Sequence, residues 1–167
     1  MARPEAHTLG IIGTGREARA QFGAMLRVLP ITTARAYSRA PEHRERFARE
    51  MHEKHEIAVE PVQSAEECVR EADVVVTSTS ASAPMLQGSW LREGTHIAAI
   101  GATTPHRREL DEEAIARAGT VVVESLPAAQ AELGELRYAV ERGKLRWGRV
   151  RELKDIVAGL VPGRTSP

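Results

Sequence analysis

Short apolar runs alternate with segments of helical periodicity along this chain of 167 residues. The runs cover residues 8–13, 33–37, 57–62, 73–77, 96–100 and 120–124. Several of them lack polar alternation, which is typical of strands buried on both faces of a parallel sheet. Strands that alternate with helices indicate an α/β fold. We therefore predict a doubly wound, Rossmann-type, mostly parallel sheet of about six strands with helices on both faces.

Helical segments fill the gaps between these runs, at residues 18–29, 41–54, 64–72, 110–118 and 125–142. The second is highly charged, and only Phe47 and Met51 lie on its expected inner side. The third begins with a capping box, in which Ser64 is followed by Glu67. After Gly143 the pattern weakens, and no further element is expected.

Composition restricts the class of protein further. The chain is 42% hydrophobic, and 23 Lys and Arg balance 23 Asp and Glu, so no net positive charge favours a nucleic-acid partner. No apolar stretch approaches the roughly 20 residues that cross a bilayer. A single cysteine, Cys68, and an N-terminus without an apolar signal core favour the cytoplasm. We expect one globular domain over residues 1–167, with no membrane and no nucleic-acid partner.

The most informative motif is the sequence GTGREA at residues 13–18, which follows a predicted strand and opens a predicted helix. This context is what a dinucleotide-binding GxGxxA motif requires. Gly13 allows a tight turn, Gly15 lets the backbone approach a pyrophosphate, and the helix N-terminus offers N–H groups to the anion. The alternative is a purely structural turn. The surrounding strands and helices favour dinucleotide binding.

The choice of cofactor is predicted at the end of the second strand, where NAD-binding domains usually carry an acidic residue. Here Tyr37 is followed by Ser38 and Arg39, and no acid is present. A hydroxyl and a guanidinium suit a 2′-phosphate, so we expect NADP(H) to be preferred over NAD(H). Arg44 is a further candidate for this phosphate. The alternative is that Ser38 caps a helix and Arg39 is simply solvated.

Two further segments end predicted strands, at residues 77–80 (TSTS) and 100–105 (IGATTP). Ligands of doubly wound sheets collect at this carboxyl edge. Hydroxyls such as those of Thr77 and Thr79 are expected to line the cofactor crevice, and the small residues after Ile100 let nicotinamide and substrate approach the backbone. The alternatives are a hydroxyl-rich turn and an ordinary strand-to-helix connection.

Other reactive residue types are weaker candidates. His52 and His55 are spaced by three residues, not the four of a zinc-protease helix, and lack an evident third ligand, so no metal site is expected. Cys68 is expected to be a buried small hydrophobe. His106 follows the Gly101 loop and could lie near substrate, although an exposed loop histidine is the alternative.

In this order, the segments GTGREARAQ, VVVTSTSASAPML, HIAAIGATTPHRRELD, AELGEL and VAGLVPGRTSP resemble the ornithine cyclodeaminase and mu-crystallin family. The resemblance runs from about Thr8 to Pro167, and GATTPHRREL is its most specific part. It implies a Rossmann domain for NAD or NADP, which in the family adjoins a second domain that binds substrate and makes a homodimer. We expect that second domain to be absent from this chain, and the chain alone to be mainly monomeric.

By position, the resemblance implies roles for eleven cofactor-binding residues. Gly13, Thr14, Gly15, Arg16 and Glu17 would hold the pyrophosphate. The adenosine ribose end would meet Ser38 and Arg39, the crevice Thr77 and Thr79, and the nicotinamide side Ile100 and Gly101.

One position departs from the family pattern. The cyclodeaminases carry a catalytic aspartate where this chain has Thr103, and a threonine cannot act as that base, so ornithine cyclodeamination is disfavoured. The resemblance implies instead the cofactor-binding domain of an NADPH-dependent imine or ketimine reductase, or of an amino-acid dehydrogenase. The substrate would be a small amino acid, imine or keto acid. No catalytic residue is identified, and the chain alone is expected to be inactive. The alternative is a non-catalytic, crystallin-like protein that binds NADPH or a small ligand.

Overall fold

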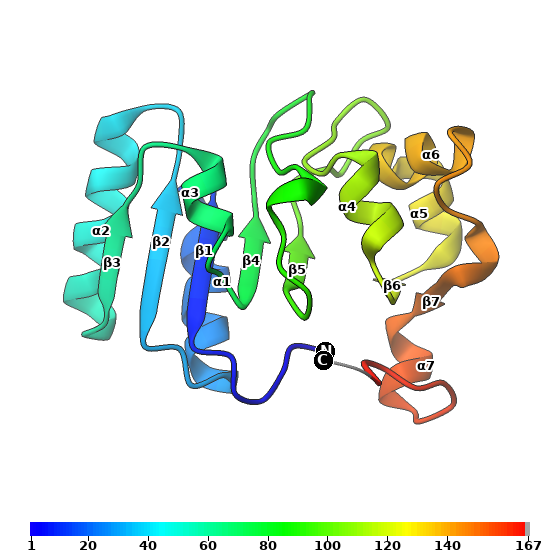
Figure 1. The fold of residues 1–167 in the computed structure, drawn as a ribbon, viewed down its shortest axis with the longest axis horizontal. Helices are drawn as coiled ribbons and strands as arrows, with labels where there is room; N and C mark the ends of the chain where they lie inside the picture. The colour runs from blue at the N-terminus through cyan, green and yellow to red at the C-terminus, as the bar shows by residue number, and fades with distance from the viewer. Residues whose placement is uncertain (166–167) are drawn as a thin grey trace. The chain divides into compact units, whose positions relative to one another are not determined.

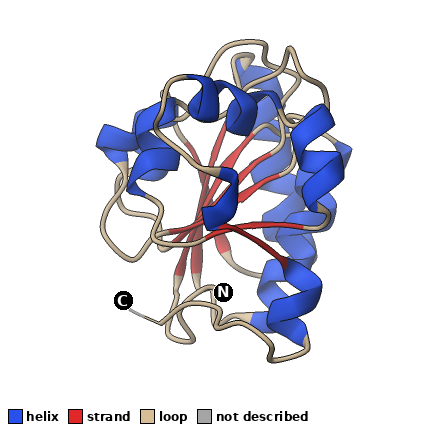
Figure 2. Cartoon of the chain, turned by 90° about the vertical axis from the view of Figure 1, so that its right-hand side faces the viewer, coloured by secondary structure: helices blue, strands red, loops and turns tan. Residues whose placement is uncertain are grey.

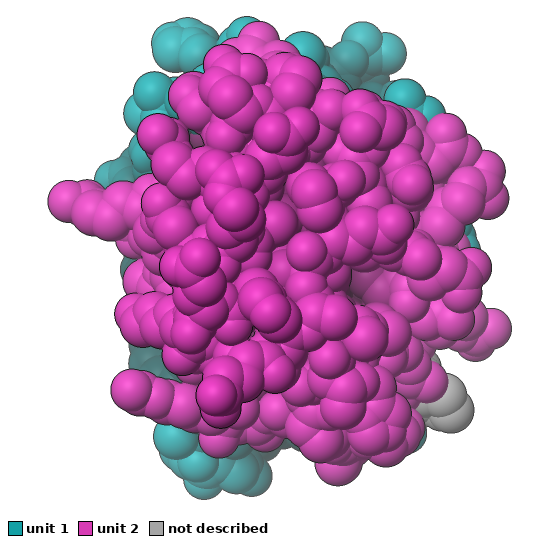
Figure 3. All heavy atoms as spheres, turned by 90° about the vertical axis from the view of Figure 1, so that its left-hand side faces the viewer, with its two compact units in different colours: residues 1, 80–89, 101–167 teal, residues 2–79, 90–100 magenta. Residues whose placement is uncertain are grey.

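The computed structural model describes residues 1–165 and divides the chain into two compact units. Unit 2 comprises residues 2–79 and 90–100, and unit 1 comprises residue 1, residues 80–89 and the chain from 101 onward (Figure 3). No helix among the described residues is both long and apolar enough to cross a membrane.

Unit 2 is built on a sheet of five parallel strands in the order β3-β2-β1-β4-β5 (Figure 1). The strands are β1 (Thr8–Ile12), β2 (Thr33–Tyr37), β3 (Ala58–Pro61), β4 (Val74–Thr77) and β5 (His96–Ala99). The chain leaves β1 on one side toward β2 and β3, and later returns on the other side to β4 and β5. This reversal beside β1 is the switch point of a doubly wound sheet, where crevices form at the carboxyl edge.

Helices α1 (Arg16–Val28) and α2 (Pro41–His55) cover one face of this sheet, and α3 (Ala65–Val69) lies on the other (Figures 1 and 2). The helices bury their apolar stripes against β1, β2 and β4, and Phe22 meets Phe47 edge to face with ring centroids 5.8 Å apart. The inner side of α2 includes Ala48 and Arg44 besides the expected Phe47 and Met51. As predicted, Ser64 caps α3 by accepting a hydrogen bond from the Glu67 N–H at 3.1 Å.

Strand register brings the ends of four strands together. Ile12 of β1 pairs with Tyr37 of β2 and with Thr77 of β4, and Thr77 pairs with Ala99 of β5. The segments that follow these residues therefore leave the sheet at one edge. This alignment positions the predicted cofactor residues of unit 2.

Unit 1 contains α4 (Glu112–Arg117), β6 (Val121–Val123), α5 (Leu126–Glu132), α6 (Gly134–Glu141), β7 (Val150–Glu152) and α7 (Leu153–Val157). Two single turns of 3-10 helix complete the described elements, η1 (Gly88–Trp90) and η2 (Trp147–Arg149). Strands β6 and β7 pair in parallel as a separate two-stranded sheet.

The architecture matches the predicted α/β class, but three details of the prediction were wrong. The expected sixth strand of one sheet, at residues 120–124, instead pairs with β7. The expected helix over residues 125–142 is interrupted at Leu133, whose ψ of 95° is not helical. Elements also follow Gly143, where none was expected, because β7 and α7 are too short to show a periodicity.

Candidate functional site

The turn after β1 requires glycine at its first position. Gly13 has a φ of +95°, and a Cβ atom there would lie 2.4 Å from the Ser78 carbonyl oxygen. Its N–H donates to the Tyr37 carbonyl at 2.9 Å, which continues the pairing of β1 with β2. The turn is therefore locked between the ends of β2 and β4, and any side chain at Gly13 would displace it.

Gly15 lies where the turn enters α1, and its surroundings are open. A Cβ atom built on this exposed residue meets no heavy atom within 4 Å, and no side chain caps the start of the helix. Arg16 and Glu17 are exposed and pair with each other at 3.0 Å. The thirteen-residue α1 thus presents a bare, positively polarised N-terminus beside free space, a geometry that suits a pyrophosphate.

Arg19 braces this turn from within the structure. Its guanidinium donates to the carbonyl oxygens of Thr14 and Gly15, binds the Glu50 carboxylate of α2, and lies 5.3 Å from the centre of the Phe47 ring. These bonds fix the two peptides that precede α1. Sequence reasoning missed Arg19, because an arginine one turn into a charged helix gives no signal that distinguishes it from a solvated side chain.

Arg39 in the connection after β2 and Arg44 in the first turns of α2 have different roles. Arg44 is buried, donates to the Ser38 carbonyl at 3.0 Å and to the Gln63 side chain, and stacks on Tyr37. Arg39 is exposed, and among residues 1–165 no hydrogen bond or ion pair of its guanidinium is found. Arg44 is therefore committed to shaping the turn, whereas the charge of Arg39 remains available to an anion.

Ser38 does not cap α2, whose N-cap is Ala40 without any side-chain bond. The Ser38 hydroxyl instead donates to the Ala40 carbonyl at 3.0 Å. This bond tightens the turn and keeps the hydroxyl partly exposed at the carboxyl edge.

The hydroxyl segment after β4 divides by burial. Thr77 is fully buried at the strand end, whereas Thr79 is partly exposed and its methyl group approaches Gly13. Between them, the N–H of Ser78 donates to the Ile12 carbonyl at 2.9 Å. The Ser78 hydroxyl oxygen is buried and has no hydrogen-bond partner among the described residues. A buried unpaired hydroxyl is costly unless a ligand or water completes it. The unpaired Ser78 hydroxyl and the open space at Gly15 are thus two observations that fit a ligand beside the glycine turn.

Ile100 and Gly101 follow β5. The Ile100 N–H donates to the Thr77 carbonyl at 3.0 Å within unit 2. Within unit 1, the Gly101 N–H donates to the carboxylate of Glu109 at 2.7 Å. The sequence analysis named Gly101 as a candidate cofactor-binding residue but did not identify Glu109 as its hydrogen-bond partner.

Glu109 belongs to a pair of buried glutamates in unit 1. Glu109 is fully buried, and the Glu135 carboxylate accepts from the N–H groups of Glu109 and Leu110 at 2.9 and 3.3 Å. Burial raises the pKa of Glu135 to about 7, against the opposing effect of these hydrogen bonds. The sequence analysis did not single out either glutamate, because the only signal that each gives is a charged residue beside apolar ones.

The cysteine and the histidines considered in the sequence differ in burial and in their contacts. Cys68 is fully buried, and burial raises the pKa of its thiol to about 12, so it packs as the predicted small hydrophobe. His52 binds the Ile57 carbonyl at 2.8 Å, and His55 packs against Phe22 with a pKa lowered by burial. His106 is exposed.

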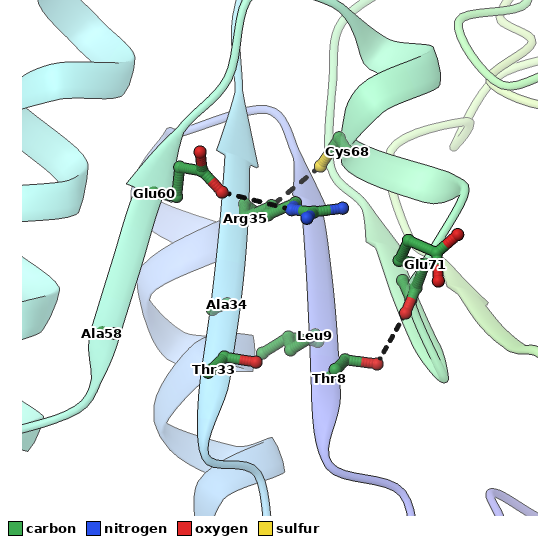
Figure 4. Close-up of a pocket in the computed structure, with 10 residues that line it drawn as sticks. Thr8, Leu9, Thr33, Ala34, Arg35, Ala58, Glu60, Cys68 and Glu71 are labelled. Atoms are coloured by element: carbon green, nitrogen blue, oxygen red, sulfur yellow. Dashed lines mark hydrogen bonds and ion pairs between the residues drawn. The ribbon is translucent and has the colours of Figure 1, made fainter.

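A separate pocket of about 230 Å³ lies on the α3 side of the sheet in unit 2 (Figure 4). Its lining includes Thr8 and Thr33, the first residues of β1 and β2, whereas the glycine turn follows the last residue of β1. Several of its polar groups bind one another: Arg35 pairs with Glu60 at 3.3 Å, and the Thr8 hydroxyl donates to the Glu71 carbonyl. None of the predicted cofactor residues lines this pocket.

With a parallel sheet, a glycine turn at its switch point and the family-like segments in place, the fold is that of Rossmann-type dinucleotide-binding proteins. The chain belongs to the ornithine cyclodeaminase/mu-crystallin family, whose model matches residues 1–167.

Named relatives agree with this membership. The chain is 38% identical over 167 residues to Delta(1)-pyrroline-2-carboxylate reductase of Bacillus cereus, covering 99% of this chain and 51% of the relative. The solved Delta(1)-pyrroline-2-carboxylate reductase of Thermococcus litoralis, in complex with NADH and L-proline, is similar with a TM-score of 0.96 and 35% identity, over 99% of this chain and 51% of that one. An archaeal alanine dehydrogenase dimer with bound NAD gives a TM-score of 0.91 and 36% identity, over 99% and 51%. The chain thus spans about half the length of the relatives it matches.

Proposed function

We propose that this chain is the NAD(P)(H)-binding domain of an oxidoreductase that acts on C–N bonds of small amino, imino or keto acids. The observation that carries the proposal is the locked Gly13 turn with open space at Gly15 and an uncapped α1 N-terminus. Family membership and the NADH- and NAD-bound relatives support it. When bound, the cofactor supplies the hydride chemistry, and the protein supplies position and electrostatics.

The residues divide by position along the carboxyl edge. The segment 13–17 holds the pyrophosphate, and Ser38 with Arg39 meets the adenosine ribose. Because β1 lies between β2 and β4 in the sheet, a dinucleotide anchored at the β1 turn with its adenosine over β2 extends its other half toward β4 and β5. Thr79, Ile100 and Gly101 follow those strands and meet the nicotinamide half, and Thr77 supports them from its buried position at the end of β4.

We also propose that NADPH is preferred over NADH. Neither of the two residues directly after β2, Ser38 and Arg39, is acidic, and within residues 1–165 the exposed Arg39 guanidinium has no hydrogen bond or ion pair. Arginine binds a phosphate bidentately and stays charged at all working pH values. The NADH and NAD in the two related structures belong to those proteins, so the preference is a specific proposal for this chain.

The test is a binding titration of NADPH and NADH, followed by nicotinamide fluorescence, with the wild-type chain and the Gly15→Val variant. A branched side chain at Gly15 occupies the open space without touching protein atoms, so we expect loss of both cofactors with an unchanged far-UV spectrum. The matched control is Gly119→Val, at another glycine with open surroundings. Retained micromolar binding by Gly15→Val would show that the turn is not the cofactor site.

We further propose that residues 1–167 form a single cofactor-binding domain that turns over no substrate alone and is mainly monomeric, whereas the complete protein is a cytoplasmic homodimer. Hydride transfer needs a clamped substrate and a proton donor or acceptor, and Thr103 offers no carboxylate at the position of the family's aspartate. The assay incubates the chain with NADPH and cyclic imines, or with NADP and amino acids. Turnover that disappears in Gly15→Val would refute this part of the proposal. A complete protein that binds cofactor without turnover would instead support the non-catalytic alternative.

A further inference from the structure

Glu109 is a fully buried residue whose carboxylate reaches Gly101, the second residue after β5. One of its oxygens accepts from the Gly101 N–H at 2.7 Å, a short bond of the charge-assisted kind. This bond joins the two ends of the segment from Gly101 to Glu109. It therefore fixes the direction of the peptide between Ile100 and Gly101.

The main chain of Glu109 is itself held on both sides. Its N–H donates to the Glu135 carboxylate at 2.9 Å, and its carbonyl accepts from the N–H groups of Met85 and Leu86 at 2.8 and 3.0 Å. Three hydrogen bonds to two other segments, residues 85–86 and Glu135, therefore hold the backbone from which the Glu109 carboxylate reaches Gly101.

The middle of the same loop lies against α6. A Cβ atom on Gly134 would come within 2.5 and 2.6 Å of the carbonyl oxygens of Pro105 and Arg107, so loop and helix meet backbone to backbone. The Arg108 guanidinium lies 4.0 Å from the centre of the Tyr138 ring. The loop is therefore ordered along its length before any ligand arrives.

We propose that Glu109 is a positioning residue that presents the Gly101 peptide to the nicotinamide end of the cofactor. The inference rests on the proposed function, which places Gly101 at that end. A preformed loop binds without the entropic cost of ordering it, so releasing the Gly101 N–H weakens binding of the nicotinamide half only.

The test compares Glu109→Asp with Glu109→Gln. Aspartate keeps the charge but is one methylene shorter, so its oxygen no longer reaches the Gly101 N–H; glutamine keeps the reach without the charge. Each variant is titrated with NADPH and with 2′-phospho-ADP-ribose, which lacks nicotinamide. We expect Glu109→Asp to bind NADPH about tenfold more weakly, with 2′-phospho-ADP-ribose unchanged and Glu109→Gln within a few-fold of wild type.

Equal weakening of both ligands, or unchanged NADPH binding in folded Glu109→Asp, would overturn the inference. If Glu109→Asp does not fold, the test is the hydrogen-exchange rate of the Gly101 amide, measured in wild type and in Glu109→Gln. Protection is expected in both, and exchange at the rate of an open loop would refute the bond on which the role depends. Failure of wild type to bind either nucleotide refutes the proposed function instead, and the Gly101 exchange rate still reports on Glu109.

Discussion

Replacing Glu135 by glutamine should change how the stability of the protein depends on pH. The folded pKa of Glu135, about 7, lies above its ordinary value of 4.5, so folding favours the protonated form. The resulting penalty is absent below the unfolded pKa, grows as the pH rises toward 7, and is complete above it. A difference of about 2.5 pKa units at about 1.4 kcal/mol each corresponds to about 3.5 kcal/mol at high pH, of which about 2.5 kcal/mol develops between pH 5 and pH 8.

The assay is urea unfolding of wild type and Glu135→Gln at several pH values from 5 to 8. Glutamine is neutral throughout and keeps an oxygen for the Glu109 and Leu110 N–H groups. Its added N–H groups shift stability by an amount that does not vary with pH, so the informative quantity is the change in the difference between the two proteins. We expect the variant to gain about 2.5 kcal/mol on wild type from pH 5 to pH 8. The exposed Glu132→Gln is the control, and parallel profiles for wild type and Glu135→Gln would refute the reasoning.

Three further predictions follow from other residues. Arg39→Ala should weaken NADPH by roughly 10- to 100-fold and leave NADH nearly unchanged in fluorescence titrations, since a charge-assisted phosphate contact contributes about 1.5–3 kcal/mol; equal losses would contradict the assignment. Cys68, with burial holding its thiol pKa near 12, should react with a thiol reagent at pH 8 only after urea is added, and reaction in the native protein would show an accessible thiol. Gly13→Ala should lower the free energy of unfolding by about 2–4 kcal/mol, because of its positive φ and the Ser78 carbonyl, whereas Gly15→Ala should change it by less than about 1 kcal/mol in the same denaturation assay.

The parts of the fold that the sequence predicted best are those with strong local patterns. Strand β2 was predicted with its observed bounds, and the apolar face of α1 was placed correctly from Ala18 and Phe22. The glycine motif carries its own geometry, since only glycine tolerates the φ of +95° at Gly13. These features depend on residues that are close together in the chain.

The missed features depend on residues that are far apart. The break at Leu133 lies beside Gly134, whose backbone meets the loop at Pro105 and Arg107, and no periodicity reveals this contact. Likewise, Glu109 reads as an ordinary charged loop residue until the fold brings its carboxylate to Gly101. The expected role of Arg44 at a 2′-phosphate remains a prediction. Its burial against Tyr37 and Ser38 was not predicted, because the sequence of this helix is highly charged and indicates a solvated surface.

The different settings of Arg39, between β2 and α2, and of Arg44, within α2, have a consequence for the redesign of cofactor preference. Because Arg44 holds the Ser38 carbonyl and the Gln63 side chain, replacing it would deform the loop along with the charge. In the described part of the chain, Arg39 makes no such bond, so its charge can be changed without altering the loop. To change the cofactor preference, Arg39 and Ser38 should be varied while Arg44 is kept. Libraries that randomise all three positions will mostly contain variants in which this loop is deformed.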